Sequence, residues 1–192
     1  MAVEAVVFDV GETLVDETLL WERAADAAGV PRFTLMGVLG GLAARGERHD
    51  RVWEILGIEP AASLWTFDDF YADALPCVAR LQDEGYQVGV AGNTPASAED
   101  ELRQQFDLVG SSASWGVEKP AAEFFANVVE LVGASPERIA YVGDRVDNDI
   151  EPALAAGLVA VHIRRGPWGY LHRPPAEAIR ITSLDELPSV LQ

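Results

Sequence analysis

The chain has 192 residues, of which 49% are hydrophobic, and its 31 acidic and 14 basic residues give a net charge of −17. This length fits one α/β domain with a small insert, and the apolar fraction is large enough for a buried core, which excludes an intrinsically disordered chain. The negative charge repels nucleic acids and anionic membranes, so neither is expected as a partner, and it disfavours anionic substrates unless a cation such as Mg²⁺ is bound near the site.

Short apolar runs alternate with helical patterns over most of the chain. The first run, residues 4–8, predicts a strand that is buried on both faces. Further strands are predicted at residues 86–92, 108–110, 139–143 and 159–163, and a short edge strand begins at residue 179. Helical patterns cover residues 97–106, 120–132 and 150–156, and a capped helix follows the last strand. This alternation predicts a doubly wound parallel sheet of the α/β class.

Residues 15–75 interrupt the alternation. Helix-like pieces at 19–28, 38–44 and 48–56 are separated by glycine and proline, and the segment has no convincing strand pattern. We therefore expect an all-helical cap insert at residues 15–75 and an α/β core made of residues 1–14 plus 76–192.

The cysteine content and the N-terminal residues indicate the cellular compartment in which the protein is expected. The single cysteine, Cys77, cannot form an intramolecular disulfide, which is consistent with a reducing environment. It lies in an apolar helical stretch without a neighbouring base and is expected to pack rather than react. The N-terminal residues lack the pattern of a signal peptide, and the apolar tracts are too short to span a bilayer. We expect a soluble cytoplasmic protein.

Polar residues follow the predicted strands at the positions where functional groups gather in a parallel sheet, the carboxyl ends of its strands. In chain order they are Asp9, Asn93, Thr94, Lys119, Asp144 and Asp149. Each one alone has an ordinary explanation as a helix cap or a solvated surface residue. Together they predict a carboxylate cluster that needs a counter-cation, and oxygen ligands suit a hard ion such as Mg²⁺. A carboxylate can also attack phosphorus and divide hydrolysis into two easier steps.

Four segments resemble the sequence motifs of the haloacid dehalogenase-like (HAD) hydrolase superfamily. Residues 8–14 (FDVGETL) are similar to the first motif, 92–94 (GNT) to the second, 116–120 (GVEKP) to the third and 143–149 (GDRVDND) to the fourth. The order and spacing of these motifs are those of the family and extend over most of the chain. The helical insert resembles the α-helical cap that one subgroup carries after the first motif, although it is short for that subgroup.

The resemblance implies a role for each matched residue. Asp9 would be the nucleophile and a metal ligand, the backbone carbonyl of Gly11 a second ligand and Asp144 a third. Asp149 would assist through a water molecule or by pairing with Lys119, and Lys119 would be a catalytic and substrate-binding residue that holds the charge developing on the phosphoryl group. The expected activity is Mg²⁺-dependent hydrolysis of a small phosphorylated metabolite through a phospho-aspartate on Asp9, and the oligomeric state, including a homodimer, is left open.

Two positions depart from the family pattern. Phosphatases of this family carry a second Asp two residues after the nucleophile, which protonates the leaving oxygen and later activates water, but this chain has Gly11. Because such general acid–base assistance is worth about 10²–10⁴-fold in rate, a slow phosphatase is one expectation. Glu12 is adjacent, but neighbouring side chains usually point apart. The second departure is Gly92, where a Ser or Thr is usual, so that Asn93 or the hydroxyl of Thr94 is expected to contact the phosphoryl group.

These departures leave alternatives open. A 2-haloacid dehalogenase expels halide without needing a proton, but it needs no metal either, and the acids of the fourth motif indicate one. A phosphonate-cleaving enzyme relies on a cap lysine, whereas Lys119 is the only lysine in the chain. A non-catalytic family member that binds a metal or a partner is a further alternative. A phospho-accepting receiver domain also uses clustered acids, but it places them in a different order along the chain.

The remaining aromatic and basic residues have two interpretations each. Arg164 and Arg165 follow the fifth predicted strand, in a loop that either packs through its tryptophan or offers an arginine to a substrate anion. The insert tryptophans, Trp21, Trp53 and Trp65, either line a pocket or form the core of the insert. The histidines have no metal-ligand spacing and are expected to be structural or on the surface; they are His49, His162 and His172.

Overall fold

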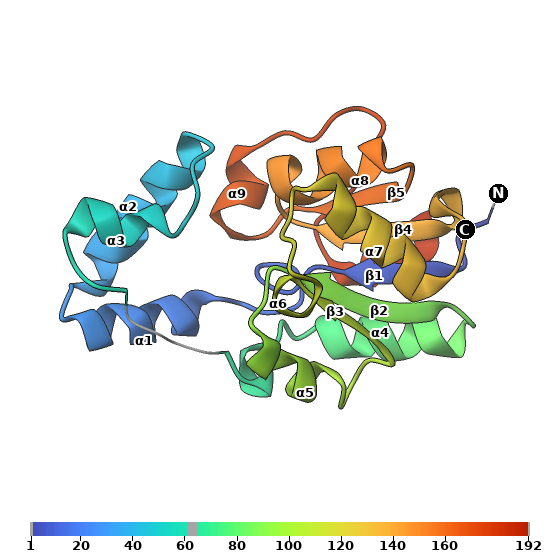
Figure 1. Ribbon diagram of the computed structural model, residues 1–192, viewed down its shortest axis with the longest axis horizontal. Helices are drawn as coiled ribbons and strands as arrows, with labels where there is room; N and C mark the ends of the chain where they lie inside the picture. Colours follow the sequence, from blue (N-terminus) through green and yellow to red (C-terminus); the bar gives the residue numbers. More distant parts are fainter. Residues whose placement is uncertain (1, 61–64, 192) are drawn as a thin grey trace.

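The computed structural model describes residues 2–60 and 65–191, and its centre is a parallel sheet with helices on both faces (Figure 1). The strands are β1 (Ala5–Phe8), β2 (Gln87–Gly92), β3 (Leu108–Ser111), β4 (Ile139–Gly143), β5 (Val159–Ile163) and β6 (Ile179–Ile181). They form one six-stranded sheet in the order β3-β2-β1-β4-β5-β6, and every neighbouring pair is parallel. The predicted α/β fold is therefore confirmed.

Strand β1 lies in the middle of the sheet and is buried on both faces. Its side chains alternate: Val6 and Phe8 pack into the core on one face of the sheet, and Ala5 and Val7 into the core on the other. Because no polar face is required, the strand consists of apolar residues throughout. Phe8 pairs with a residue of β2 on one side and of β4 on the other, so the three strands end at the same edge and the next residue, Asp9, lies between them.

Ten α-helices accompany the sheet in the described part of the chain. They are α1 (Thr18–Ala28), α2 (Arg32–Ala44), α3 (Arg51–Leu56), α4 (Ala74–Asp83), α5 (Glu99–Leu102), α6 (Ser112–Trp115), α7 (Ala122–Val132), α8 (Glu151–Ala155), α9 (Gly166–Leu171) and α10 (Leu187–Val190). Helices α4 and α7 lie on opposite faces of the sheet, and α1 to α3 extend beyond its edge (Figure 1). None of the helices in these residues is long and apolar enough to cross a membrane.

Two predicted helices differ from the observed ones. Helix α2 begins at Arg32 rather than at residue 38 and runs through Gly37, Gly40 and Gly41. Glycine costs about 1 kcal/mol per helical position relative to alanine, but the buried leucines of α2 pack into the core of the insert and offset that cost. The helix predicted at 97–106 is also wrong in extent: α5 has only four residues, and a 3-10 turn precedes it.

Helix α9 joins the helical segment to the sheet domain. Trp168 of α9 packs into a cluster with Ala25 of α1 and Leu35 of α2. The imidazole Nε2 of His172 lies 2.7 Å from the carbonyl oxygen of Ala43, at the end of α2. The helices α1 to α3 are therefore attached to the sheet domain at α9 as well as through the chain at both of their ends.

Candidate active site

Three buried carboxylates meet at the carboxyl edge of the sheet. Asp9 directly follows β1, and its amide donates a hydrogen bond to the carbonyl of Val142 in β4, with an N···O distance of 2.8 Å. Asp144 follows β4, and Asp149 lies in the π-helical turn Val146–Ile150 that precedes α8. Carboxylate oxygens of Asp9, Asp144 and Asp149 all lie within 4.8 Å of one another. A cluster of this kind has the oxygen donors and the negative charge that bind a hard divalent cation.

Lys119 lies between two of these acids. Its Nζ is 2.6 Å from Oδ1 of Asp9 and 2.6 Å from Oδ1 of Asp149, and its side chain is only 1% exposed. Burial by itself would lower the pKa of Lys119, but the charges of Asp149 and Asp9 outweigh burial and raise the pKa well above its usual value. The ammonium group therefore stays charged and fixes the orientation of both carboxylates.

Asp144 carries no comparable partner. Within residues 2–60 and 65–191, no group donates a hydrogen bond to its carboxylate, although the residue is 3% exposed. Burial, followed by the charges of Asp149 and Asp9, raises its pKa well above the usual range. A buried carboxylate without a compensating donor is costly. The backbone of Asp144 is held by His162, whose Nε2 lies 3.0 Å from the Asp144 carbonyl oxygen.

Asn93 and Thr94, which follow β2, differ in their hydrogen bonds. The Asn93 side chain accepts a hydrogen bond from the amide of Lys119 at 2.8 Å and donates one to its carbonyl at 3.1 Å, so it holds the backbone of that lysine. The hydroxyl of Thr94 is buried and has no hydrogen-bond partner among the described residues. One hydrogen of the Asn93 amide is therefore already used, and the Thr94 hydroxyl is enclosed by the protein.

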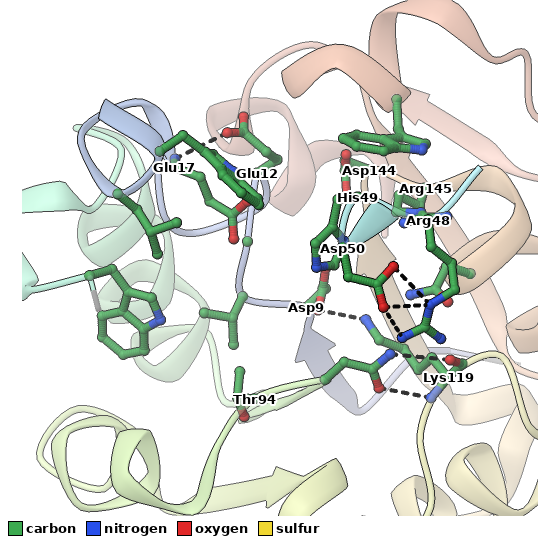
Figure 2. A pocket seen from close by; sticks show the side chains of 18 of the residues that line it. Asp9, Glu12, Glu17, Arg48, His49, Asp50, Thr94, Lys119, Asp144 and Arg145 are labelled. Atoms are coloured by element: carbon green, nitrogen blue, oxygen red, sulfur yellow. Dashed lines mark hydrogen bonds and ion pairs between the residues drawn. The ribbon is translucent and has the colours of Figure 1, made fainter. Parts of the chain in front are cut away.

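A cavity of about 570 Å³ lies over the carboxylates and is closed on one side by the helical segment (Figure 2). Asp9, Thr94, Lys119 and Asp144 line it from the sheet domain, and Trp21, Arg48, His49, Asp50 and Trp53 line it from the other side. His49 lies between two aromatic rings, 5.8 Å from the Trp21 ring and 6.4 Å from the Trp168 ring. His49 is exposed, in agreement with its expected place on the surface, and it also lines the cavity, which no local pattern predicts.

Two further carboxylates line the cavity next to Gly11. Tyr71 donates a hydrogen bond of 2.7 Å to Oε2 of Glu12, and the amide of Glu17 donates one of 3.0 Å to Oε1 of Glu12. Burial, followed by the charge of Glu12, raises the pKa of Glu17 to about 7. Sequence reasoning did not single out Glu17, which precedes α1 and matches no motif.

The arginines after β5 contact other residues of the protein. Arg165 forms an ion pair with Asp73 and donates a hydrogen bond of 2.9 Å to the carbonyl of Thr13. The guanidinium carbon of Arg164 lies 4.7 Å from the centre of the Tyr170 ring. Neither arginine lines the cavity as the described residues form it, whereas Trp168 of the same loop is buried and lines it.

Comparisons with known proteins agree with this architecture. The sequence is 29% identical over 201 residues to a glyceraldehyde 3-phosphate phosphatase of Methanopyrus kandleri, and the alignment covers 86% of each chain. The magnesium-bound YfnB of Bacillus subtilis matches the structure with a TM-score of 0.74 over 100% of both chains at 19% identity. A 2-haloacid dehalogenase of Pseudomonas syringae pv. Tomato matches with a TM-score of 0.64 over 98% of both chains, also at 19% identity. At such identities the two structures establish the fold alone.

The family itself is established by a family-wide sequence profile. The profile of the haloacid dehalogenase-like hydrolases matches residues 3–157, which include all four of the segments that resemble the family motifs. The chain belongs to the haloacid dehalogenase-like hydrolase family and is a hydrolase.

Proposed function

We propose that this hydrolase is a phosphatase that acts on a small phosphorylated metabolite, with Asp9 as the nucleophile. The observation that carries the proposal is the meeting of Asp9, Asp144 and Asp149 within 4.8 Å, with Asp9 and Asp144 lining the cavity and Nζ of Lys119 at 2.6 Å from two of the acids. In this reaction an Asp9 oxygen attacks phosphorus, the bond to the leaving oxygen breaks, and water then releases phosphate from the phospho-aspartate.

Magnesium is the metal that suits these donors. Asp9, Asp144 and the carbonyl of Gly11 would hold it, with Asp149 assisting through a water molecule or through Lys119. The fit rests on the buried Asp144 carboxylate, which lacks a hydrogen-bond donor in the described residues and therefore calls for a cation. When bound, Mg²⁺ would align the phosphoryl group and offset its repulsion from the nucleophile.

The chain's own residues complete the binding site in this proposal. The hydroxyl of Thr94, which is unpaired, would donate a hydrogen bond to a phosphoryl oxygen, and Asn93 would hold Lys119 in place. The helices of residues 15–75 would act as the cap and exclude water from the cavity through Trp21 and His49. A small substrate is favoured by the cavity volume of about 570 Å³. The phosphatase name of the Methanopyrus relative supports the phosphoryl group as the reacting centre.

Phosphate release from a panel of esters tests the proposal. The panel contains glyceraldehyde 3-phosphate, glycerol 3-phosphate and p-nitrophenyl phosphate, each with MgCl₂ and with EDTA, and chloride release from 2-chloropropionate is measured in parallel. We expect phosphate release that requires Mg²⁺, that is lost in Asp9→Asn and that persists in Asp83→Asn, a matched change at an exposed position at the end of α4.

Two results would contradict the proposal. Metal-dependent phosphate release that Asp9→Asn leaves intact would remove Asp9 as the nucleophile. Chloride release without metal, in the absence of phosphate release, would identify the chain as a dehalogenase.

A further inference from the structure

Gly11 occupies the position at which a phosphatase of this family needs a proton-transferring acid, yet its backbone does not require glycine. Its φ lies outside the left-handed region, so an L-residue would fit the backbone conformation. A side chain at position 11 would be blocked only by a neighbouring side chain. A Cβ atom built on Gly11 would meet Glu17, with its Cδ at 2.9 Å and its Cγ at 3.6 Å, and would come closest of all to its Oε1. The carboxyl group of Glu17 therefore fills the space that a side chain at position 11 would use.

The contacts of Glu17 hold its carboxyl group there. The indole Nε1 of Trp21, one helical turn later, donates a hydrogen bond of 3.1 Å to Oε2. The amide of Glu17 is fixed by Oε1 of Glu12 at 3.0 Å. In the described part of the chain no donor is bonded to Oε1 of Glu17, the oxygen beside Gly11. One oxygen is thus anchored, and the other remains available at the cavity, where Glu17 and Asp9 both lie (Figure 2).

Glu12, the other carboxyl group beside Gly11, is less suited than Glu17 to supply the missing acid. Both of its oxygens are engaged, one by the hydroxyl of Tyr71 at 2.7 Å and one by the amide of Glu17 at 3.0 Å. Its backbone is in the left-handed region, with a φ of 53°, which is uncommon for a residue other than glycine. Glu12 therefore acts as a support for the turn that carries Glu17.

We propose that Glu17 is the general acid and base of this enzyme and replaces, from the start of α1, the acid that is missing at position 11. The inference rests on the phosphatase function proposed above. As Asp9 Oδ bonds to phosphorus and the bond from phosphorus to the leaving oxygen breaks, the Glu17 carboxylic acid gives its proton to that oxygen and the alcohol departs. The Glu17 carboxylate then takes a proton from water, the hydroxide oxygen bonds to phosphorus, and the bond to Asp9 breaks. Phosphate leaves, and Asp9 and protonated Glu17 are restored.

Leaving-group dependence separates this role from a structural one. Proton donation matters for the alkoxide that leaves glycerol 3-phosphate and little for p-nitrophenolate, which is a good leaving group. The ratio kcat/KM covers the steps up to departure of the alcohol, so it reports this proton transfer. For Glu17→Gln, which keeps an oxygen to accept from Trp21, we expect kcat/KM for glycerol 3-phosphate to fall about 10²–10⁴-fold, and that for p-nitrophenyl phosphate less than about 10-fold.

The matched control is Glu22→Gln, the same change within the helix that Glu17 precedes, at a residue that pairs with Arg32 outside the cavity. Equal losses on the two esters, or no loss on either, would overturn the role of Glu17 while leaving the phosphatase proposal in place. If the wild-type enzyme released phosphate from no ester with Mg²⁺ present, the phosphatase proposal would fail, and the role of Glu17 would fail with it.

Moving the acidic side chain from position 17 to position 11 provides a second test. Gly11→Asp alone should lower kcat/KM for glycerol 3-phosphate, because the new side chain meets the Glu17 carboxyl group. In Gly11→Asp combined with Glu17→Ala the acid is supplied from position 11 and the space is free. We expect the double variant to exceed Glu17→Ala at least about 10-fold on glycerol 3-phosphate. A double variant no faster than Glu17→Ala, or a single Gly11→Asp variant faster than wild type, would overturn the inference.

Discussion

The two glycines that replace family side chains are explained by the atoms around them. At position 11 the space is taken by Glu17, as argued above. At position 92 a Cβ atom would come within 2.9 Å of Oδ1 of Asp9, the oxygen that Lys119 binds. A Ser or Thr at this position would therefore displace the carboxylate from its pair with Lys119. The glycine preserves the orientation of Asp9.

Removing the charge of Lys119 should destabilise the protein strongly. Lys119→Met would leave Asp9 and Asp149 buried without their shared cation, and breaking such a buried pair costs about 3–5 kcal/mol. Urea denaturation in EDTA should show this loss in the free energy of unfolding. In Arg80→Met, which removes an exposed pair with Glu84, the loss should be no more than about 0.5 kcal/mol. Similar losses in both variants would show that the buried pairs contribute little.

The raised pKa of Glu17 should make stability depend on pH. Burial raises its pKa to about 7 in the folded chain from the ordinary value of 4.5, so the folded state favours the protonated form. The associated stability is complete below pH 4.5 and is lost as the pH rises through about 7, by up to about 1.4 kcal/mol for each unit of pKa difference. In EDTA, the free energy of unfolding of wild type minus that of Glu17→Gln should fall between pH 5 and pH 8. A constant difference over this range would contradict the shift.

At the scale of the elements, the sequence predicted the sheet better than the turns between its parts. Each strand is an apolar run, and in a parallel sheet the runs must end at one edge, which is why Asp9, Lys119 and Asp144 could be expected together. Glu17 could not be expected there, because its position depends on the tight turn after β1 in which Gly11 bridges to Val15. The packing of Trp168 against α1 and α2 could not be predicted from the sequence either, because it joins segments far apart in the chain.

Helix α9 should control how firmly the helical segment is held. Trp168 is 7% exposed within the cluster formed with α1 and α2, and truncation of a buried tryptophan costs about 3–5 kcal/mol. In Trp168→Ala we expect faster amide hydrogen exchange in α2, while the amides of β1 in the centre of the sheet remain slow. Tyr170→Ala, on the same helix at a side chain that is 63% exposed, should leave exchange in α2 unchanged. Uniform acceleration in α2 and β1 would show that the two parts unfold as one unit.

At the scale of the whole molecule, the net charge of −17 has two distinct consequences. Self-repulsion of the surface acids destabilises the compact state, and any salt weakens that repulsion by screening. The three carboxylates at the carboxyl edge of the sheet are a separate matter, because they are buried and Lys119 compensates only part of their charge, which leaves the rest for a bound cation. A general salt effect and a specific magnesium effect should therefore coexist, and they can be separated at constant ionic strength.

Thermal unfolding in MgCl₂ and in NaCl of equal ionic strength separates general salt screening from specific magnesium binding. Both salts should raise Tm by screening, but MgCl₂ at about 100 times its Kd should add about 2.7 kcal/mol through binding to the folded state, or about 5–10 °C for a chain of this size. Asp144→Asn removes a ligand and should respond alike to the two salts, whereas Asp107→Asn, a matched change at an exposed residue, should keep the extra response to magnesium. Magnesium and sodium salts that act equally on the wild-type protein would show that the carboxylate cluster does not bind the ion. An extra magnesium response that survives in Asp144→Asn would place the binding elsewhere on the acidic surface.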